Sequence, residues 1–305
     1  MLKNVIFPKF TYRRLFVAKI TKTVRGQASL NPFFNPLNFL QFENIKNFWN
    51  YSGTKINCNV CGHDSSLFYD FPNVAHRIDH KVGILRETLQ CRVCGATMRD
   101  RTLASAMLST LTEVFHSRVS SINDVSDSTL AQLKILDTDS FSPISTILSK
   151  LSNYVRSSYV TDKPFGIELS AKRFNINLEK IDFPPQCFDL VLTSDVSEHI
   201  RDINQAHLEI FRILRSGGIY IFTAPFDEKC SGHHILVDTS TPVDKYLVPK
   251  QIHGDPVSGG ILAYRVFGRG IFSDLEKIGF KVSYKNISDN VAGIYNGDVF
   301  IACKS

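Results

Sequence analysis

The sequence has no long apolar run, and its first 50 residues have almost no acid. The chain has 305 residues and is 43% hydrophobic. No stretch approaches the roughly 18 apolar residues that a membrane helix needs. Those first 50 residues carry eight Lys or Arg against Glu43 alone, a net charge of +7, whereas the whole chain has a net charge of +6. The other residues therefore sum to −1 and lack the Lys/Arg stripe typical of a nucleic-acid surface. These absences favour a soluble, cytoplasmic protein.

Residues 1–50 form a basic tail in which Lys and Arg alternate with Phe, Tyr, Leu and Ile. The scarcity of acids suits an anionic partner, such as a membrane surface or an anionic polymer, or a transit peptide. A tail packed loosely on the body is the alternative. No apolar core of about seven residues lies between the charges, so a secretory leader is not expected.

Four of the seven cysteines form two Cys-x-x-Cys-Gly motifs. Two such motifs supply the four thiolates that tetrahedral zinc prefers, whereas a disulfide framework would suit a secreted chain. The 29 residues between the motifs exceed the usual spacing of about 15 to 20, so reduced thiols or a redox pair stay open. We expect a structural zinc with the ligands Cys58, Cys61, Cys91 and Cys94.

The clearest pattern lies between residues 181 and 225. Phe188 to Thr193 is an almost continuous apolar run, typical of a strand buried on both faces. Apolar residues at helical spacing follow from Ile203 to Leu214, and a second apolar strand, Ile219 to Ala224, comes after Gly217-Gly218. The pattern predicts a βαβ unit. Ligands bind outside the carboxyl ends of parallel strands, so a site is expected in residues 194–199.

This stretch, FDLVLTSDVSEHI followed by RILRSGG and IYIFTAPF, resembles the second half of a class I S-adenosylmethionine-dependent methyltransferase. The likeness extends over about residues 133–305. Two cysteine motifs, the sequence Arg-Asp-Arg and a helix ahead of such a domain also resemble a bacterial subset with a four-cysteine zinc-knuckle module. The resemblance implies an α/β fold with a doubly wound, mostly parallel Rossmann-like sheet. We expect a tail at 1–50, a zinc-knuckle module with its connecting helix at 51–119, and a methyltransferase-like domain at 130–305.

The resemblance also implies which residues bind S-adenosylmethionine. The first strand is expected at residues 133–137, and in the family the loop that follows it carries glycines. This chain has no glycine between Gly95 and Gly166. A second strand at 158–161 would present its acid to the ribose hydroxyls, although a surface acid fits the same spacing. A third strand at 175–181 would present an acid to the adenine amino group and an aromatic ring to the adenine face. The expected cofactor residues are Asp137, Asp139, Asp162, Asp182, Phe183 and Ser194.

The expected reaction is transfer of a methyl group to an oxygen, nitrogen or carbon nucleophile that the sequence does not identify. Such a transfer needs its reactants in line, and a base if the acceptor is protonated. Asp195, His199 and His253 are the candidates for orienting the acceptor or removing its proton, although each would also fit a structural role. Two alternatives are a non-catalytic scaffold on a degenerate methyltransferase fold and a nucleic-acid-modifying methyltransferase.

Overall fold

A computed structural model of the chain describes residues 42–70, 84–116, 118–125, 129–253 and 260–305. Most of the basic tail, residues 1–41, and therefore the predicted contact with an anionic partner, lies outside these ranges. No helix within these ranges is long and apolar enough to cross a membrane. The helices are α3 (Phe42–Tyr51), α4 (Leu85–Thr88), α5 (Met98–Phe115), α6 (Ile122–Val125), α7 (Pro143–Leu148), α8 (Ile203–Ile213) and α9 (Gly270–Ile278), with 3-10 turns η3 (Thr129–Gln132) and η4 (Ser197–His199).

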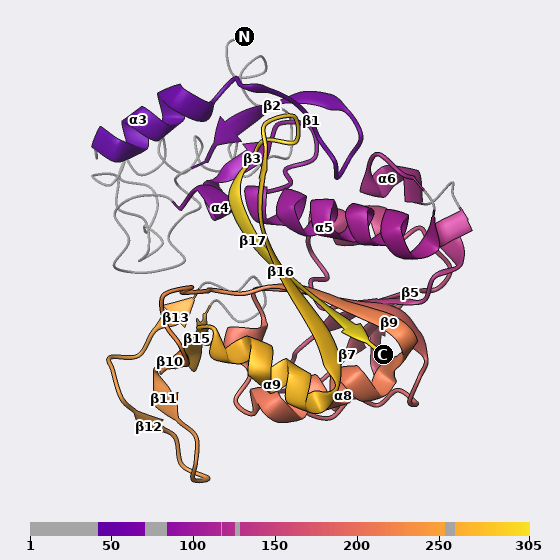
Figure 1. Cartoon of the computed structure of the whole chain (residues 1–305), viewed down its shortest axis with the longest axis vertical. Helices are drawn as coiled ribbons and strands as arrows, with labels where there is room; N and C mark the ends of the chain where they lie inside the picture. Colours follow the sequence, from indigo (N-terminus) through magenta and orange to yellow (C-terminus); the bar gives the residue numbers. More distant parts are fainter. Residues whose placement is uncertain (1–41, 71–83, 117, 126–128, 254–259) are drawn as a thin grey trace.

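An eight-stranded sheet lies at the centre of the molecule (Figure 1), in the order β16-β17-β9-β8-β4-β5-β7-β6. The five strands from β9 to β7 are parallel, whereas β6, β17 and β16 pair antiparallel. The bounds are β4 (Ile135–Asp137), β5 (Tyr154–Ser158), β6 (Glu168–Ser170), β7 (Arg173–Asn175), β8 (Phe188–Ser194), β9 (Leu214–Thr223), β16 (Phe280–Asp289) and β17 (Ile294–Lys304).

The direction of winding reverses between β4 and β8. The chain adds β5 and then β7 on one side of β4, and returns to add β8 and then β9 on the other side. In such a sheet a ligand binds outside the carboxyl ends of the strands at the reversal, here the ends of β4 and β8. The predicted fold class, a doubly wound and mostly parallel α/β sheet, is confirmed.

Alternating side chains of the central strands contribute to two cores. Leu190, Leu192 and Ile221 belong to the cluster that contains the buried side chains of α5. Val191 and Tyr220 belong to the cluster formed with α8 and α9. The helices lie on opposite sides of the sheet (Figure 1). Both faces are covered, which explains the almost continuous apolar run predicted for β8.

The cysteine motifs belong to a small antiparallel sheet of β1 (Lys55–Asn57), β2 (Asp64–Tyr69) and β3 (Leu89–Cys91). This sheet shares the α5 cluster with the main sheet. The β16–β17 hairpin extends from the main sheet to it (Figure 1), and the backbone N–H of Asn57 donates to the carbonyl of Val291 at 2.9 Å. We call this small sheet, together with α4 and α5, the cysteine module. The cysteine module therefore packs on the sheet that carries the candidate site.

Several predicted element boundaries are wrong. The second strand ends at Ser158, and the third spans only Arg173–Asn175, after which Asn177 and Lys180 pair across a turn. Between β9 and α9 the described residues contain three short strand pairs that the sequence pattern did not predict: β10 (His233–Ile235) with β15 (Arg265–Phe267), β11 (Val237–Asp238) with β12 (Lys245–Tyr246), and β13 (Ile252–His253) with β14 (Ile261–Leu262). Strands of two or three residues carry too few side chains for a period-2 pattern.

Candidate functional site

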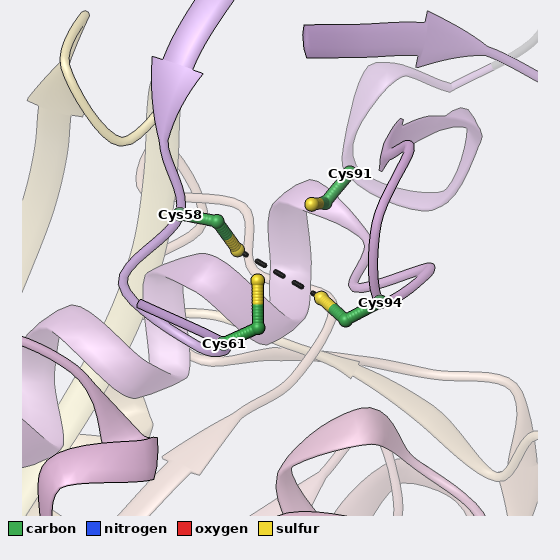
Figure 2. Close-up of side chains that lie close together, drawn as sticks. All are labelled: Cys58, Cys61, Cys91 and Cys94. Carbon is green, nitrogen blue, oxygen red and sulfur yellow. Dashed lines mark hydrogen bonds between the residues drawn. The ribbon is translucent and has the colours of Figure 1, made fainter. Parts of the chain in front are cut away.

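The four predicted cysteine ligands converge (Figure 2). Their sulfur atoms all lie within 4.8 Å of one another, and those of Cys58 and Cys94 are 3.8 Å apart. Cys58 follows β1 and Cys91 ends β3, so the small sheet brings the two motifs together. Four sulfurs at this separation match the donor set of a tetrahedral structural metal site.

The two motifs have the same turn geometry. The backbone N–H of Gly62 donates to the carbonyl of Cys58 at 2.7 Å, and that of Gly95 donates to the carbonyl of Cys91 at 2.9 Å. Both glycines have positive φ, +76° and +80°, a conformation that other residues rarely adopt. The glycine after each pair therefore allows the turn that directs its sulfurs inward.

A buried cation lies beside the cysteine cluster. Arg101 has no exposed surface, and its guanidinium donates to the carbonyls of Leu89 at 3.2 Å, Ala96 at 2.6 Å and Gly293 at 3.0 Å. Burial lowers the pKa of Arg101, and the nearby cysteines oppose that shift. A positive charge here suits a cluster of thiolates, because an unpaired buried charge would be costly.

Buried polar groups line the switch point between β4 and β8. Asp137 is buried and accepts a hydrogen bond of 2.6 Å from the Tyr154 hydroxyl. Burial and the neighbouring Asp139 raise the pKa of Asp137 to about 7. The hydroxyl oxygens of Thr138 and Ser194 are buried without a hydrogen-bond partner among the described residues. Such groups fit a site for a polar ligand, because buried polar atoms are normally paired.

The loop after β4 turns without glycine. The backbone N–H of Asp139 donates to Oδ1 of Asp137 at 2.9 Å, and that of Phe141 donates to Oδ1 of Asp139 at 3.1 Å. No residue from 138 to 142 has a positive φ. Side-chain oxygens take the place of the expected glycines by hydrogen-bonding to the backbone two residues further on.

Loops after β5 and β7 carry the acids predicted for the ribose and adenine. Asp162 is exposed, four residues beyond the end of β5. Asp182 is exposed and packs against Gly166, whose N–H donates to the carbonyl of Asn175 at the end of β7. In the loop that follows β5, the rings of Tyr159 and Phe165 stack at 5.3 Å while remaining 52% and 38% exposed. The sequence interpretation missed this aromatic pair.

Phe183, predicted to cover the adenine face, is a core contact. Its ring packs edge-on against Phe174 at 5.5 Å and Phe188 at 5.2 Å, in the cluster that also contains α8. Lys134, which precedes β4, lies 6.0 Å from the ring centre. Lys134 precedes β4 and Phe188 begins β8, so the ring packs near the amino ends of these strands, whereas the ligand is expected at their carboxyl ends. This packing does not favour the adenine role predicted for Phe183.

Asp195 joins the switch point to the cysteine module. It has a positive φ of 50°, and its carboxylate pairs with Arg86 at 2.7 Å and Arg99 at 3.2 Å, from α4 and the start of α5. The Thr223 hydroxyl donates to it at 3.0 Å. Burial alone would raise the pKa of Asp195, but the two arginines outweigh it and hold the pKa at about 2. An acid this strongly paired is a poor proton acceptor, so the predicted base role does not fit.

Two of the predicted catalytic residues, His199 and His253, meet at Glu198. The Glu198 side chain is 1% exposed, and both its oxygens lack a hydrogen-bond partner among the described residues. Oε1 lies 3.6 Å from His199 Nε2 and 3.9 Å from His253 Nδ1. Burial and the charge of Asp195 raise the pKa of Glu198 to about 8. Glu198 directly precedes His199 in the stretch FDLVLTSDVSEHI, and this position is the signal that could have identified Glu198 from the sequence.

Backbone contacts hold this cluster at the carboxyl edge. The N–H of Tyr264 donates to the carbonyl of Glu198 at 2.8 Å, and His199 Nδ1 lies 2.8 Å from the carbonyl oxygen of Leu262 on β14. β14 pairs with β13, which ends in His253. Arg265 donates to the carbonyls of Ile200 at 2.5 Å and Arg201 at 2.9 Å. The short strands between β9 and α9 thus bring His253 to His199 in the η4 turn, which lies 54 residues earlier in the sequence.

Comparison with known proteins supports the fold. A protein-family profile described as a methyltransferase domain matches residues 152–222, which run from just before β5 into β9. No curated protein matches the chain.

Among solved structures, the chain is similar to an S-adenosylmethionine-dependent methyltransferase from Mesorhizobium loti (12% identity, 56% of this chain and 91% of that chain, TM-score 0.37). It is also similar to S-adenosylmethionine-dependent methyltransferases of Methanosarcina mazei (15%, 56% and 91%, 0.34). A third is the [4+2]-cyclase SpnF (12%, 66% and 80%, 0.39). At these scores the likenesses to solved structures carry no argument, and the fold rests on the strand order and on the family match over residues 152–222.

Proposed function

We propose that the protein is an S-adenosylmethionine-dependent methyltransferase. The observation that carries the proposal is the switch point between β4 and β8. At the ends of these strands the hydroxyls of Thr138 and Ser194 are buried without a hydrogen-bond partner among the described residues, and Glu198 follows four residues after β8. The methyltransferase-domain match over residues 152–222 supports the same conclusion.

In this proposal the cofactor lies across the carboxyl ends of β4, β5 and β8. Asp137, Asp139 and Ser194 line the part of the site that takes the methionine group, and Asp162 accepts hydrogen bonds from the ribose hydroxyls. The exposed Tyr159–Phe165 pair offers the apolar face for adenine, with Asp182 as the acceptor for its amino group.

Glu198, His199 and His253 form the acceptor side of the site. During transfer the acceptor atom bonds to the methyl carbon as the carbon–sulfur bond breaks, and the electron pair stays on sulfur. Holding the two reactants in line supplies much of the rate. Imidazole and carboxylate groups within reach of the acceptor serve to orient it and to take up its proton. Asp195 has a positioning role, because its ion pairs hold the η4 turn against the cysteine module.

We further propose that Cys58, Cys61, Cys91 and Cys94 hold a structural zinc. Four thiolates leave no open coordination position, so this metal would stabilise the fold and take no part in the reaction. Its effect on the site would pass through Arg86 and Arg99, which belong to the module and contact Asp195.

Calorimetric titration of the 305-residue chain with S-adenosylmethionine and with its demethylated product tests the proposed function. We expect saturable binding of both at about one per chain. Absence of binding of either compound at millimolar concentration would contradict the proposal and favour a non-catalytic role for the fold.

A further inference from the structure

We propose that Glu198, His199 and His253 form a second metal site, which binds a divalent cation such as Mn²⁺ through one carboxylate and two imidazoles. One ligand atom from each residue lies within 4.8 Å of the other two. Carboxylate and imidazole ligands are those that Mn²⁺, Fe²⁺, Co²⁺ and Zn²⁺ accept. The site is separate from the four-cysteine cluster, which has only sulfur donors.

The buried carboxylate is the first independent support. Glu198 is 1% exposed, with no hydrogen bond to either oxygen among the described residues. A buried acid without partners is costly, and such groups are normally paired or bind a metal. Its nearest imidazole nitrogens, at 3.6 and 3.9 Å, lie at ion-pair distance from the same oxygen, Oε1.

The orientation of His199 is the second support. Nδ1 lies 2.8 Å from the carbonyl oxygen of Leu262, and because a carbonyl only accepts, Nδ1 carries the hydrogen and donates it. In the neutral ring Nε2 then has the lone pair that metals bind, and this is the nitrogen that points to Glu198. Metal-binding histidines usually donate their other N–H to a carbonyl or carboxylate in this way.

The spacing requires a small closure. Ligand atoms at about 2.1 Å from one ion lie about 3.0 to 3.4 Å apart. The two separations from Glu198 Oε1, 3.6 and 3.9 Å, therefore need to shrink by about half an ångström, which side-chain rotation can supply. The two imidazole ligand atoms, which lie within 4.8 Å of each other, need to approach to the same range.

The site deepens the proposed function, on which this step rests, by identifying the acceptor class. Three protein ligands leave coordination positions for an acceptor oxygen and water. A cation lowers the pKa of a hydroxyl that binds it. The acceptor would therefore be a hydroxyl compound. With the cation bound, the three side chains act as its ligands in place of taking up the proton themselves: the hydroxyl proton passes to water, the oxygen bonds to the methyl carbon, and the carbon–sulfur bond breaks with the pair on sulfur.

Titration of the full-length chain with Mn²⁺, followed by electron paramagnetic resonance, tests the metal site. Mn²⁺ prefers oxygen and nitrogen ligands and should not displace a metal from four thiolates. We expect about one Mn²⁺ per chain, with spin-echo modulation from imidazole nitrogen. Glu198→Gln and His253→Ala should each weaken binding at least about tenfold. The matched control is His234→Ala, which removes a surface histidine paired with Asp227 at 2.8 Å and should bind as the wild type does.

No Mn²⁺ binding at millimolar concentration, or binding without imidazole modulation, would overturn the inference. So would affinity in both site variants equal to that of the control. The wild-type spin-echo result decides the question even if a variant fails to fold. Binding of the demethylated cofactor is measured separately. If the chain binds that compound but no Mn²⁺, only the proposed metal site is contradicted. If the chain binds Mn²⁺ but neither form of the cofactor, the proposed methyltransferase function is contradicted.

Discussion

Replacing Asp195 with Asn tests whether the cysteine module is joined to the candidate site by ion pairs. The change keeps the shape of the side chain and removes the charge that faces Arg86 and Arg99. An ordinary aspartate pKa of 3.8 against a folded value of about 2 corresponds to about 2 kcal/mol of stabilisation at neutral pH. Removing one partner of a fully buried pair costs about 3 to 5 kcal/mol. The Asp195 and arginine side chains are 15% to 25% exposed, so we expect a loss of about 2 to 4 kcal/mol.

Urea unfolding at pH 7 measures this loss as a lower midpoint with an unchanged slope. Because the folded pKa of Asp195 is depressed, its contribution is present above pH 3.8 and disappears as the pH falls toward 2. The control Glu113→Gln breaks an exposed pair with Lys285 at 3.7 Å and should cost no more than about 1 kcal/mol. If Asp195→Asn lowers the free energy of unfolding by no more than the control does, the ion pairs of Asp195 do not join the cysteine module to the candidate site.

Three further changes test other parts of the molecule. His207 is 1% exposed, and burial together with Arg265 and His233, against an opposing effect of Asp274, lowers its pKa to about 3. The unfolded chain therefore binds the proton first, so stability falls as the pH drops below about 6.5, by about 2 kcal/mol at pH 5. In His207→Met the fall in unfolding free energy between pH 7.5 and 5 should shrink by that amount, and an unchanged pH dependence would contradict the burial argument. Cys91→Ser should lower the zinc content, measured by mass spectrometry, well below one per chain and reduce the melting temperature; full zinc content would exclude Cys91 as a ligand. Asp162→Ala should weaken binding of the demethylated cofactor roughly 10- to 150-fold in calorimetry, by about 1.5 to 3 kcal/mol, whereas Asp64→Ala on β2 should not; equal affinities would remove Asp162 from the ribose site.

The parts of the fold with strong periodicity were predictable. The apolar run that became β8 and the helical spacing that became α8 identified the βαβ unit, and each extends over at least seven residues. Two motifs with their own glycines identified the cysteine cluster. These signals are local, because each depends on residues close together in the sequence.

The contacts that the sequence did not reveal are not local. Phe183 follows an acid, as expected of a base-stacking residue, but its ring packs on Phe174 of β7 and Phe188 of β8. Arg86, which forms an ion pair with Asp195, lies 109 residues away in the sequence, and no sequence pattern predicts this ion pair. A pairing that depends on how two distant elements pack is not encoded in local spacing.

The position of the demethylated cofactor in crystals of the 305-residue chain tests most directly whether the switch point binds it. We expect the compound across the carboxyl ends of β4, β5 and β8, with adenine beside Tyr159 and Phe165 and the sulfur directed toward the Glu198 cluster. A compound bound at the opposite edge of the sheet, or beside the cysteine cluster, would contradict this expectation.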